Sequence, residues 1–168
     1  MRVVSDSSPL IYLSKLNRLG LLKQLYGTIA IPRKVFEEVV ERGKKEGYKD
    51  ALAVEEAIAQ KWITVHEAKH SKNLLLLAPE IDEGEAQALS LALNTKARTV
   101  LIDDATARSV ARSLGLNPRG TAYAILLAMK KGLVTKKEAK KLFQELIQAG
   151  FRIAPELYAQ LLEEIENA

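Results

Sequence analysis

The stretch VLIDDATAR, residues 100–108, changes abruptly from apolar to acidic. Its first three residues are apolar and mostly β-branched, a run that is typical of a buried strand. Asp103 and Asp104 follow directly, although carboxylates are costly to bury without a compensating partner. The stretch therefore predicts a strand whose carboxyl end carries two acids, and the rest of the chain must explain why they stand there.

A similar change occurs near the start of the chain, where the β-branched run RVVSD ends in Asp6. The next residues break the strand, and Ser8 followed by Pro9 predicts the N-cap and the first position of a helix. Further strands are expected in GTIAIP (27–32) and WITVHEA (62–68), which helical segments separate. This alternation of strands and helices predicts an α/β sandwich with a mainly parallel sheet.

Helical patterns fill most of the remaining chain. Helices are expected from Leu10 to Leu19, in segments 32–47 and 48–61, and from near Asp82 to residue 97. Segments 98–115 and 116–132 are each expected to hold a short strand or turn followed by a helix, and Thr135 to cap a helix in 135–150. Segment 151–165 is predicted to hold a strand-like piece and a final helix, whereas segment 70–79 follows no clear pattern.

The composition is typical of a globular protein with a single domain, residues 1–168. Hydrophobic residues make up 48% of the chain and charged residues 27%, which argues against a disordered or fibrous protein. The chain has no cysteine, which excludes thiol chemistry and predicts an intracellular, cytoplasmic location. No apolar run approaches the ~20 residues of a membrane-spanning helix, so no membrane contact is expected.

The formal net charge of +4 is concentrated in two basic stretches. These are RGKKEGYK (42–49) and MKKGLVTKKEAKK (129–141). Such stretches attract the phosphate backbone of nucleic acids, but they are equally typical of solvated helix faces. Charge alone leaves both interpretations open.

The acids at the strand ends are expected to lie together. In parallel sheets, ligands bind beyond the carboxyl ends of the strands, and Asp6 and the pair Asp103–Asp104 fall at such ends. Glu85 shares its helix face with apolar residues that are expected to pack on the sheet, so it stands at the edge of a buried stripe. For Glu85, a functional role and simple complementation of the helix dipole, which also explains Asp82 and Glu83, both remain open.

Another pair of acids, Glu37 and Glu38, flanks the apolar stripe of the helix in segment 32–47. The helical pattern does not choose between them, and a solvated pair is the alternative. Several carboxylates within ~4–6 Å raise each other's pKa values unless a cation compensates them. Oxygen ligands suit Mg²⁺ or Mn²⁺, whereas His66 and His70, the only candidate nitrogen ligands, are expected at the surface.

Five motifs in order resemble the PIN-domain family: Asp6 with the SSPLIYLSKL that follows it, then IPRKVFEEV, DEGEAQALSLAL, LIDDATARSVARSLGL and RGTAYAILLAMKKGLV. More narrowly, they resemble a prokaryotic branch related to the VapC-like toxins, and the tail FRIAPELYAQLLEEI is similar to this branch too. The resemblance implies a three-layer α/β/α sandwich with a mainly parallel central sheet. It also implies a metal-dependent ribonuclease, commonly dimeric, whose acidic residues hold Mg²⁺ or Mn²⁺.

The resemblance also implies which residues form the site. The expected catalytic residues, which are also expected metal ligands, are Asp6, Glu38, Glu85 and Asp104. Glu38 rather than Glu37 matches the family's glutamate. Glu85 stands where many relatives have an aspartate, so the carboxylate is kept on an arm that is one methylene longer.

Asp103 is an additional acid beside the matched position of Asp104. It is expected to be a further metal ligand, a group that holds a water molecule, or a cap of the helix that begins at Ala105. Hydroxyl groups that support the site are expected at three positions: Ser7, Ser8 and Thr121.

The function that the resemblance implies is hydrolysis of RNA by an Mg²⁺- or Mn²⁺-dependent endoribonuclease, with single-stranded RNA as substrate. It further implies a homodimer and the toxin role in a toxin–antitoxin pair, with an antitoxin protein as partner. The alternative is a noncatalytic module on the same fold that binds nucleic acid or a partner, which the longer arm of Glu85 favours. A receiver-like or phosphatase-like fold is disfavoured because too little chain follows Asp104 for its remaining strands.

Overall fold

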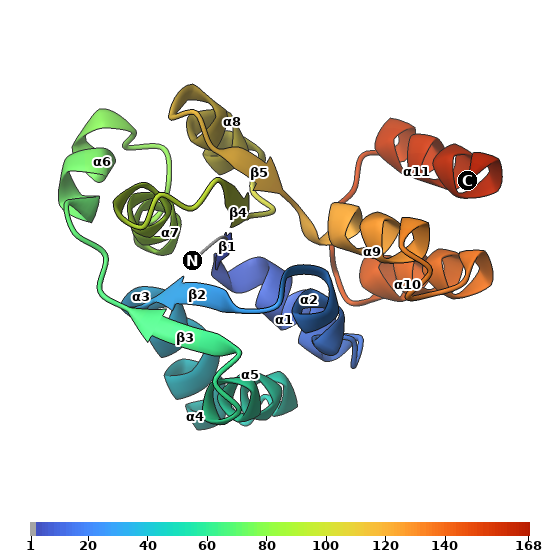
Figure 1. Ribbon diagram of the computed structural model, residues 1–168, viewed down its shortest axis with the longest axis horizontal. Helices are drawn as coiled ribbons and strands as arrows, with labels where there is room; N and C mark the ends of the chain where they lie inside the picture. Colours follow the sequence, from blue (N-terminus) through green and yellow to red (C-terminus); the bar gives the residue numbers. More distant parts are fainter. Residues whose placement is uncertain (1–2) are drawn as a thin grey trace.

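The computed structural model describes residues 3–168 as layers of helices around a parallel sheet (Figure 1). The sheet has the order β3-β2-β1-β4-β5, and every pair of neighbouring strands in it is parallel. Its strands are β1 (Val3–Ser5), β2 (Ile29–Pro32), β3 (Ile63–His66), β4 (Thr99–Leu101) and β5 (Asn117–Arg119). The predicted α/β sandwich with a parallel sheet is thus confirmed.

Helices cover both faces of the sheet, as the three-layer prediction requires. One face packs against α6 (Ser71–Leu77), α7 (Glu83–Asn94) and α8 (Ala105–Ser113). The other face carries α1 (Ser7–Lys15), α2 (Gly20–Tyr26), α3 (Arg33–Phe36), the π-helical segment η1 (Glu37–Arg42), α4 (Gly43–Lys45), α5 (Lys49–Ala59), α9 (Thr121–Lys130), α10 (Lys136–Gln148) and α11 (Pro155–Asn167). No helix in residues 3–168 is both long and apolar enough to cross a membrane.

The strands divide their side chains between two cores because neighbouring residues of a strand point to opposite faces of the sheet. In β1, Val3 belongs to the core beneath α1 and α9, and Val4 to the core beneath α7 and α8. In β4, Val100 faces the α7 side and Leu101 the α1 side. Burial on both faces explains why VLI in the opening stretch is continuously apolar rather than alternating.

The start of the chain differs from the prediction in two places. Helix α1 begins at Ser7, so Ser8 is not its cap: the chain is extended at Asp6 and helical directly afterwards. The backbone N–H of Asp6 is still bonded to the carbonyl of Leu101 at 2.9 Å, which carries the strand-like geometry up to that residue. The helix expected up to Leu19 is split into α1 and α2, because Asn17 adopts a left-handed conformation with φ 54°.

Two later segments also differ from expectation. The strand-like piece at residues 151–153 has no regular structure; Phe151 instead packs edge-on against Tyr12, with ring centroids 5.0 Å apart. Segment 70–79, in which no sequence pattern was clear, contains α6. The structure of such short apolar runs depends on tertiary packing more than on local preference, so periodicity does not classify them.

The strand order creates a point where the chain reverses direction across the sheet. From β1 the chain proceeds outward to β2 and β3, then returns to the other side of β1 for β4 and β5. In open parallel sheets, ligands bind at such a reversal, outside the carboxyl ends of the strands. The ends of β1 and β4, which carry Asp6 and Asp103–Asp104, lie on either side of it.

Candidate functional site

Asp6 stands at the reversal point and is buried, with 6% of its surface exposed. The pairing of Ser5 with Leu101 places it level with the end of β4. Burial raises the pKa of Asp6 from 3.8 to about 8, and the nearby acids Asp82, Glu85 and Glu38 add to this effect. The structure therefore brings several carboxylates from separate segments around one buried acid.

Glu38 reaches this cluster from η1, the wider turn of the helix that follows β2. Its Oε2 accepts a hydrogen bond of 2.7 Å from the hydroxyl of Ser7, which joins the start of α1 to η1. Of the two candidate glutamates, the structure thus connects Glu38 to the site. Glu37 instead forms an exposed ion pair with Arg33.

Glu85 and Asp82 enter the cluster from the N-terminus of α7. They form a capping box: Asp82 Oδ1 accepts from the N–H of Glu85 at 2.8 Å, and Glu85 Oε2 accepts from the N–H of Asp82 at 2.9 Å. Glu85 is 8% exposed, and burial, followed by the acids Asp82, Asp104 and Glu38, raises its pKa. Glu85 therefore both complements the dipole of α7 and belongs to the acidic cluster.

Asp82 is a residue of the cluster that the sequence analysis explained only by complementation of the helix dipole. Among the neighbouring acids, its charge has the largest effect on the pKa of both Asp6 and Glu85. The spacing Asp82-x-x-Glu85, which is a capping-box pattern, was the available signal, since it ties the two carboxylates to the same turn.

Gly84 lies between two of these acids and leaves room for them. A Cβ at this position would lie 3.1 Å from Glu38 Oε2 and 3.3 Å from Asp82 Oδ1. Any side chain here would therefore press on carboxylate oxygens from two different segments. The absence of a side chain at Gly84 allows α7 and η1 to present their acids to a common space.

Asp104 caps α8, with its Oδ1 accepting from the N–H of Ala107 at 2.8 Å. Of the three alternatives for Asp103, the helix cap is wrong, because the extended residue directly before Ala105 is Asp104. Asp104 is exposed, and it contributes to the raised pKa of Glu85. It therefore faces the acidic cluster from the β4 side.

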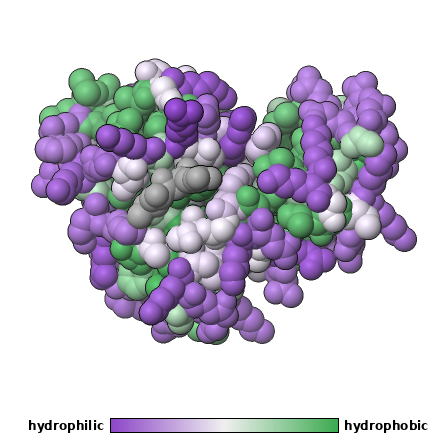
Figure 2. Space-filling view, viewed as in Figure 1, coloured by the Kyte–Doolittle hydropathy of each residue, from purple (hydrophilic) through white to green (hydrophobic). Residues whose placement is uncertain are grey.

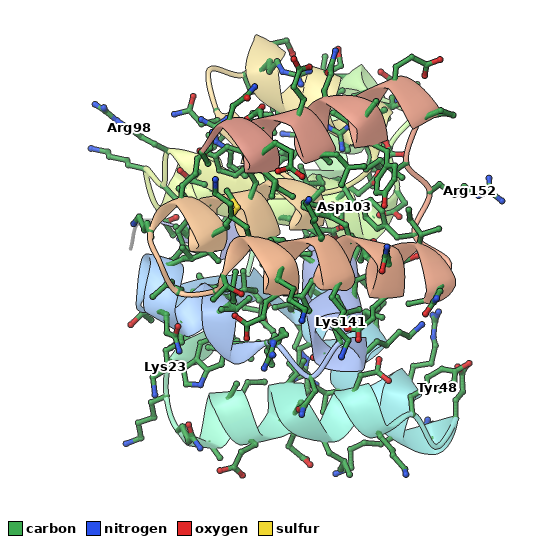
Figure 3. The ribbon with its side chains drawn as sticks, turned by 90° about the vertical axis from the view of Figure 1, so that its right-hand side faces the viewer. Lys23, Tyr48, Arg98, Asp103, Lys141 and Arg152 are labelled. Carbon is green, nitrogen blue, oxygen red and sulfur yellow. The ribbon has the colours of Figure 1, made fainter. Side chains whose placement is uncertain are left out.

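Asp103 is held by the start of α9. Both of its carboxylate oxygens accept from Thr121, one from the N–H at 2.7 Å and the other from the hydroxyl at 2.6 Å, and the Arg108 side chain donates to its backbone carbonyl. Burial still raises the pKa of Asp103 despite these bonds. In Figure 3, Asp103 lies among the packed elements, whereas Arg98 and Arg152 extend outward.

The remaining candidates lie around this arrangement. Ser8 is partly buried in the first turn of α1. His66 is partly buried at the end of the edge strand β3, with Nε2 2.8 Å from the hydroxyl of Thr64, and His70 is exposed. The described contacts connect neither histidine to the carboxylates, so the candidate ligand atoms of this cluster are carboxylate oxygens.

The donor set suits Mg²⁺ or Mn²⁺, because it consists of carboxylate oxygens, and the neighbouring acids help to raise the pKa values of Asp6 and Glu85. As the side chains stand, however, no group of three or more acids or histidines in residues 3–168 is arranged to coordinate an ion. Glu38, Asp82, Glu85 and Asp104 each accept a hydrogen bond from a neighbouring group.

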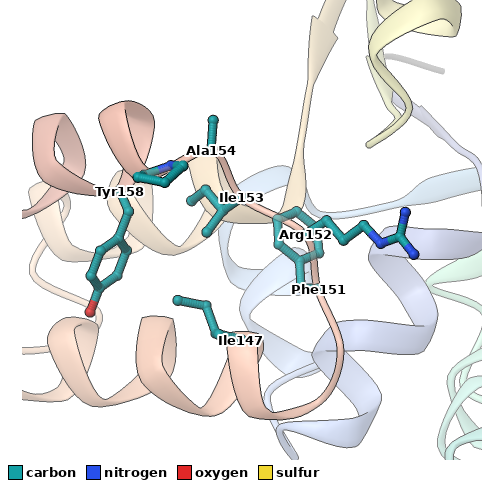
Figure 4. A pocket seen from close by; sticks show the side chains of 7 residues that line it. Ile147, Phe151, Arg152, Ile153, Ala154 and Tyr158 are labelled. Carbon is teal, nitrogen blue, oxygen red and sulfur yellow. The ribbon is translucent and has the colours of Figure 1, made fainter.

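A pocket elsewhere in the molecule has a different character. It has a volume of about 550 Å³ and is lined by residues from the end of α10 to the start of α11, among them Ile147, Ile153 and Tyr158 (Figure 4). None of the candidate site residues lines it. The acidic cluster is thus separate from this largely apolar pocket.

Comparison with known proteins agrees with the geometry. A family model described as PIN domain matches residues 2–167. No curated protein matches the chain significantly. Because the family match extends over nearly the whole chain, and the chain folds as a parallel α/β sandwich with acids at its carboxyl edge, it belongs to the PIN-domain family.

Proposed function

We propose that this protein is an Mg²⁺- or Mn²⁺-dependent endoribonuclease that hydrolyses single-stranded RNA. PIN domains are generally nucleases that use divalent metals, so family membership supports the hydrolase class. The observation that carries the proposal is the burial of Asp6 at the reversal point with Glu38, Asp82 and Glu85 around it. Such a concentration of negative charge is costly for the fold unless a cation binds there.

The ligands of the ion are proposed to be Asp6, Glu38, Glu85 and Asp104, with Asp82 as a further acid of the cluster. A bound ion would supply a water molecule of lowered pKa and neutralise charge that develops on the phosphate. Ser7 orients Glu38 through its hydroxyl, and Gly84 keeps the space between α7 and η1 open. No nucleophilic side chain is required, which agrees with the lack of cysteine in the chain.

Asp103 is proposed to support the site rather than to bind the ion directly, because Thr121 already occupies both of its carboxylate oxygens. It holds the segment that ends in Asp104 against the start of α9. Gly120 permits this contact, since a Cβ there would lie 2.9 Å from Asp103 Oδ1.

The proposal extends to biological context on the resemblance to VapC-like toxins alone. It includes a toxin role, neutralisation by an antitoxin protein, a homodimer and a cytoplasmic location. The second candidate function is a noncatalytic module that binds nucleic acid. The observation in its favour is that the acids of residues 3–168 are not arranged to coordinate an ion as they stand.

Cleavage of single-stranded RNA by the purified protein tests the proposal. We expect cleavage with Mn²⁺ or Mg²⁺, none with EDTA, and a loss of at least about 100-fold in Asp6→Asn, because the variant lacks a ligand charge. Asp50→Asn is the matched control, since Asp50 lies in α5 and is the one aspartate outside the site. Full activity of Asp6→Asn would contradict the assigned role, and RNA binding without cleavage would favour the noncatalytic module.

A further inference from the structure

Arg119 and Tyr123 form a stacked pair where β5 ends and α9 begins. The guanidinium carbon of Arg119 lies 4.4 Å from the centroid of the Tyr123 ring. Arg119 is exposed, whereas Tyr123 is partly buried in the first turn of α9. The ring therefore supports an exposed cation from below, in the geometry of a cation–π contact.

The backbone of Arg119 is separated from Asp6 by one strand and lies next to the segment that carries Asp103 and Asp104. Its side chain lies close enough to Tyr26 to affect the pKa of that phenol. Arg119 is in register with Leu101 of β4, and its carbonyl accepts from the N–H of Ile102 at 2.8 Å. Two residues further on, Thr121 holds Asp103. The stacked pair thus occupies the same carboxyl edge of the sheet as the acids, one strand further from the centre.

Several other cations of the chain are paired with acids. Of the six lysines in the basic stretch 129–141, three are paired with acids: Lys130 with Glu164, Lys140 with Glu166 and Lys141 with Glu145. These pairs hold α9 and α10 to α11 or lie within α10, and hydrophilic residues cover much of this lobe in Figure 2. Half of the lysines in the 129–141 stretch are therefore held in ion pairs with acids.

A second arginine lies over a ring on the opposite side of the cluster, but its charge is occupied. Arg33, which follows β2, lies 4.9 Å from the ring centroid of Phe36 and pairs with both Glu37 and Glu41. Arg119 forms no ion pair with a carboxylate in residues 3–168. Of the two arginine–ring pairs, only Arg119 with Tyr123 offers an uncompensated positive charge to a ligand.

We propose that Arg119, supported by Tyr123, is a binding position for one nucleotide of single-stranded RNA: its guanidinium stacks on a base and attracts the adjacent phosphate. This inference rests on the proposed function, which it deepens by naming residues that bind the RNA substrate. Guanidinium planes and aromatic rings stack on unpaired bases, whereas the bases of a duplex are already stacked on each other. Because every base has a π-face, the position tolerates different sequences.

The test measures RNA binding by fluorescence anisotropy in full-length protein carrying Asp6→Asn, so that bound RNA stays intact. A labelled 12-nucleotide single-stranded RNA is compared with a strand of the same length that lacks bases. Arg119→Ala and Tyr123→Ala are expected to raise the Kd for RNA about 10-fold, as stacking contributions of this kind predict. Tyr123→Phe, which keeps the ring, is expected to bind like the parent and also controls for folding.

Arg119→Lys separates stacking from charge, because it keeps the positive charge but lacks the planar group. We expect weaker binding of base-bearing RNA and unchanged binding of the abasic strand. Arg33→Ala and Lys141→Ala are the controls on paired cations and are expected to change the Kd less than about 3-fold.

Unchanged RNA binding in Arg119→Ala would overturn the proposal, and so would equal weakening in the Lys141→Ala control or no RNA binding by the parent. Cleavage by the wild-type protein is measured separately on the same RNA. RNA binding that depends on Arg119, without RNA cleavage, would contradict the nuclease function but support Arg119 as a binding position. RNA cleavage together with binding that does not depend on Arg119 would support the nuclease function but contradict the binding position.

Discussion

At the scale of single residues, Asp6 is the acid whose ionisation in the buried site lowers the free energy of unfolding. Its pKa is raised from 3.8 to about 8, so between these values the folded protein keeps a proton on Asp6 that the unfolded chain has released. The free energy of unfolding of the metal-free protein should therefore fall as the pH rises from about 4 to about 8. The contribution is fully present at low pH and is lost as Asp6 ionises in the folded state.

Thermal unfolding in EDTA across this pH range checks the prediction. Asp6→Asn imitates the protonated acid at every pH, so it should match the wild type near pH 4 and exceed its melting temperature near pH 8. The difference between the two proteins is the informative quantity, because it cancels the titration of surface acids such as Glu138 and Glu166. A difference that does not vary with pH would show that Asp6 ionises normally.

The residues of the site were predictable to the extent that they follow strands. Asp6 and Asp104 come directly after buried runs, and parallel strands end at one edge, so their proximity could be inferred from the sequence. The choice of Glu38 over Glu37 needed a family resemblance, because a π-helical turn changes which side chains face the sheet. The second role of Asp82 was hidden because a helix cap explains an aspartate at that position completely.

At the scale of elements, the contact between Asp103 and Thr121 fastens the end of β4 to the start of α9. Thr121 is fully buried and supplies two hydrogen bonds to the carboxylate. Thr121→Val keeps the shape of the side chain but leaves one carboxylate oxygen without its hydroxyl donor. It should lower the free energy of unfolding by about 1–3 kcal/mol.

Urea unfolding measures this effect, with Thr121→Ser as the control that retains the hydroxyl. Because the segment after Asp103 presents Asp104 to the cluster, Thr121→Val should also weaken Mn²⁺ binding, whereas Thr121→Ser should not. If both variants unfold at the same urea concentration as the wild type, the contact does not hold the two elements together.

Elements with strong local signals agreed with the sequence, and those without them did not. The cap Thr135 and its partner Glu138 form the capping box that begins α10, and Gly115 follows the end of α8 with positive φ. By contrast, Phe151 and Ile153 are aromatic or β-branched but lie in no strand; Phe151 packs edge-on against Tyr12 instead, and α11 begins at Pro155. The strand propensity of a segment does not indicate whether the fold offers it a partner strand.

At the scale of the whole molecule, strand order could not be read from the sequence, although it decides where the site lies. Residues 6, 38, 82, 85 and 104 meet because the chain goes out to β3 and returns beside β1. The periodic patterns of short strands define which residues are buried but not which strands are neighbours. The rule that ligands bind where a parallel sheet reverses direction relates the order of the strands to the place of the site.

Whether the C-terminal helices belong to the same cooperative unit is the remaining question at this scale. Leu161 of α11 is 6% exposed and belongs to the core that also contains Trp62, the single tryptophan, next to β3. If the chain is one domain, a cavity made at Leu161 must destabilise the surroundings of Trp62 as much as α11 itself. Leu161→Ala should therefore lower the free energy of unfolding by about 2–5 kcal/mol, as reported by tryptophan fluorescence.

Leu157 provides the matched control, because it is the same residue type in the same helix but is 44% exposed. Leu157→Ala should change the free energy of unfolding by less than about 1 kcal/mol. Fluorescence of Trp62 and far-UV circular dichroism should give coincident transitions in both variants, since one core would unfold in one step. A Leu161→Ala variant whose circular dichroism shifts while the fluorescence transition stays in place would show that α11 unfolds independently and that the chain is not a single cooperative domain.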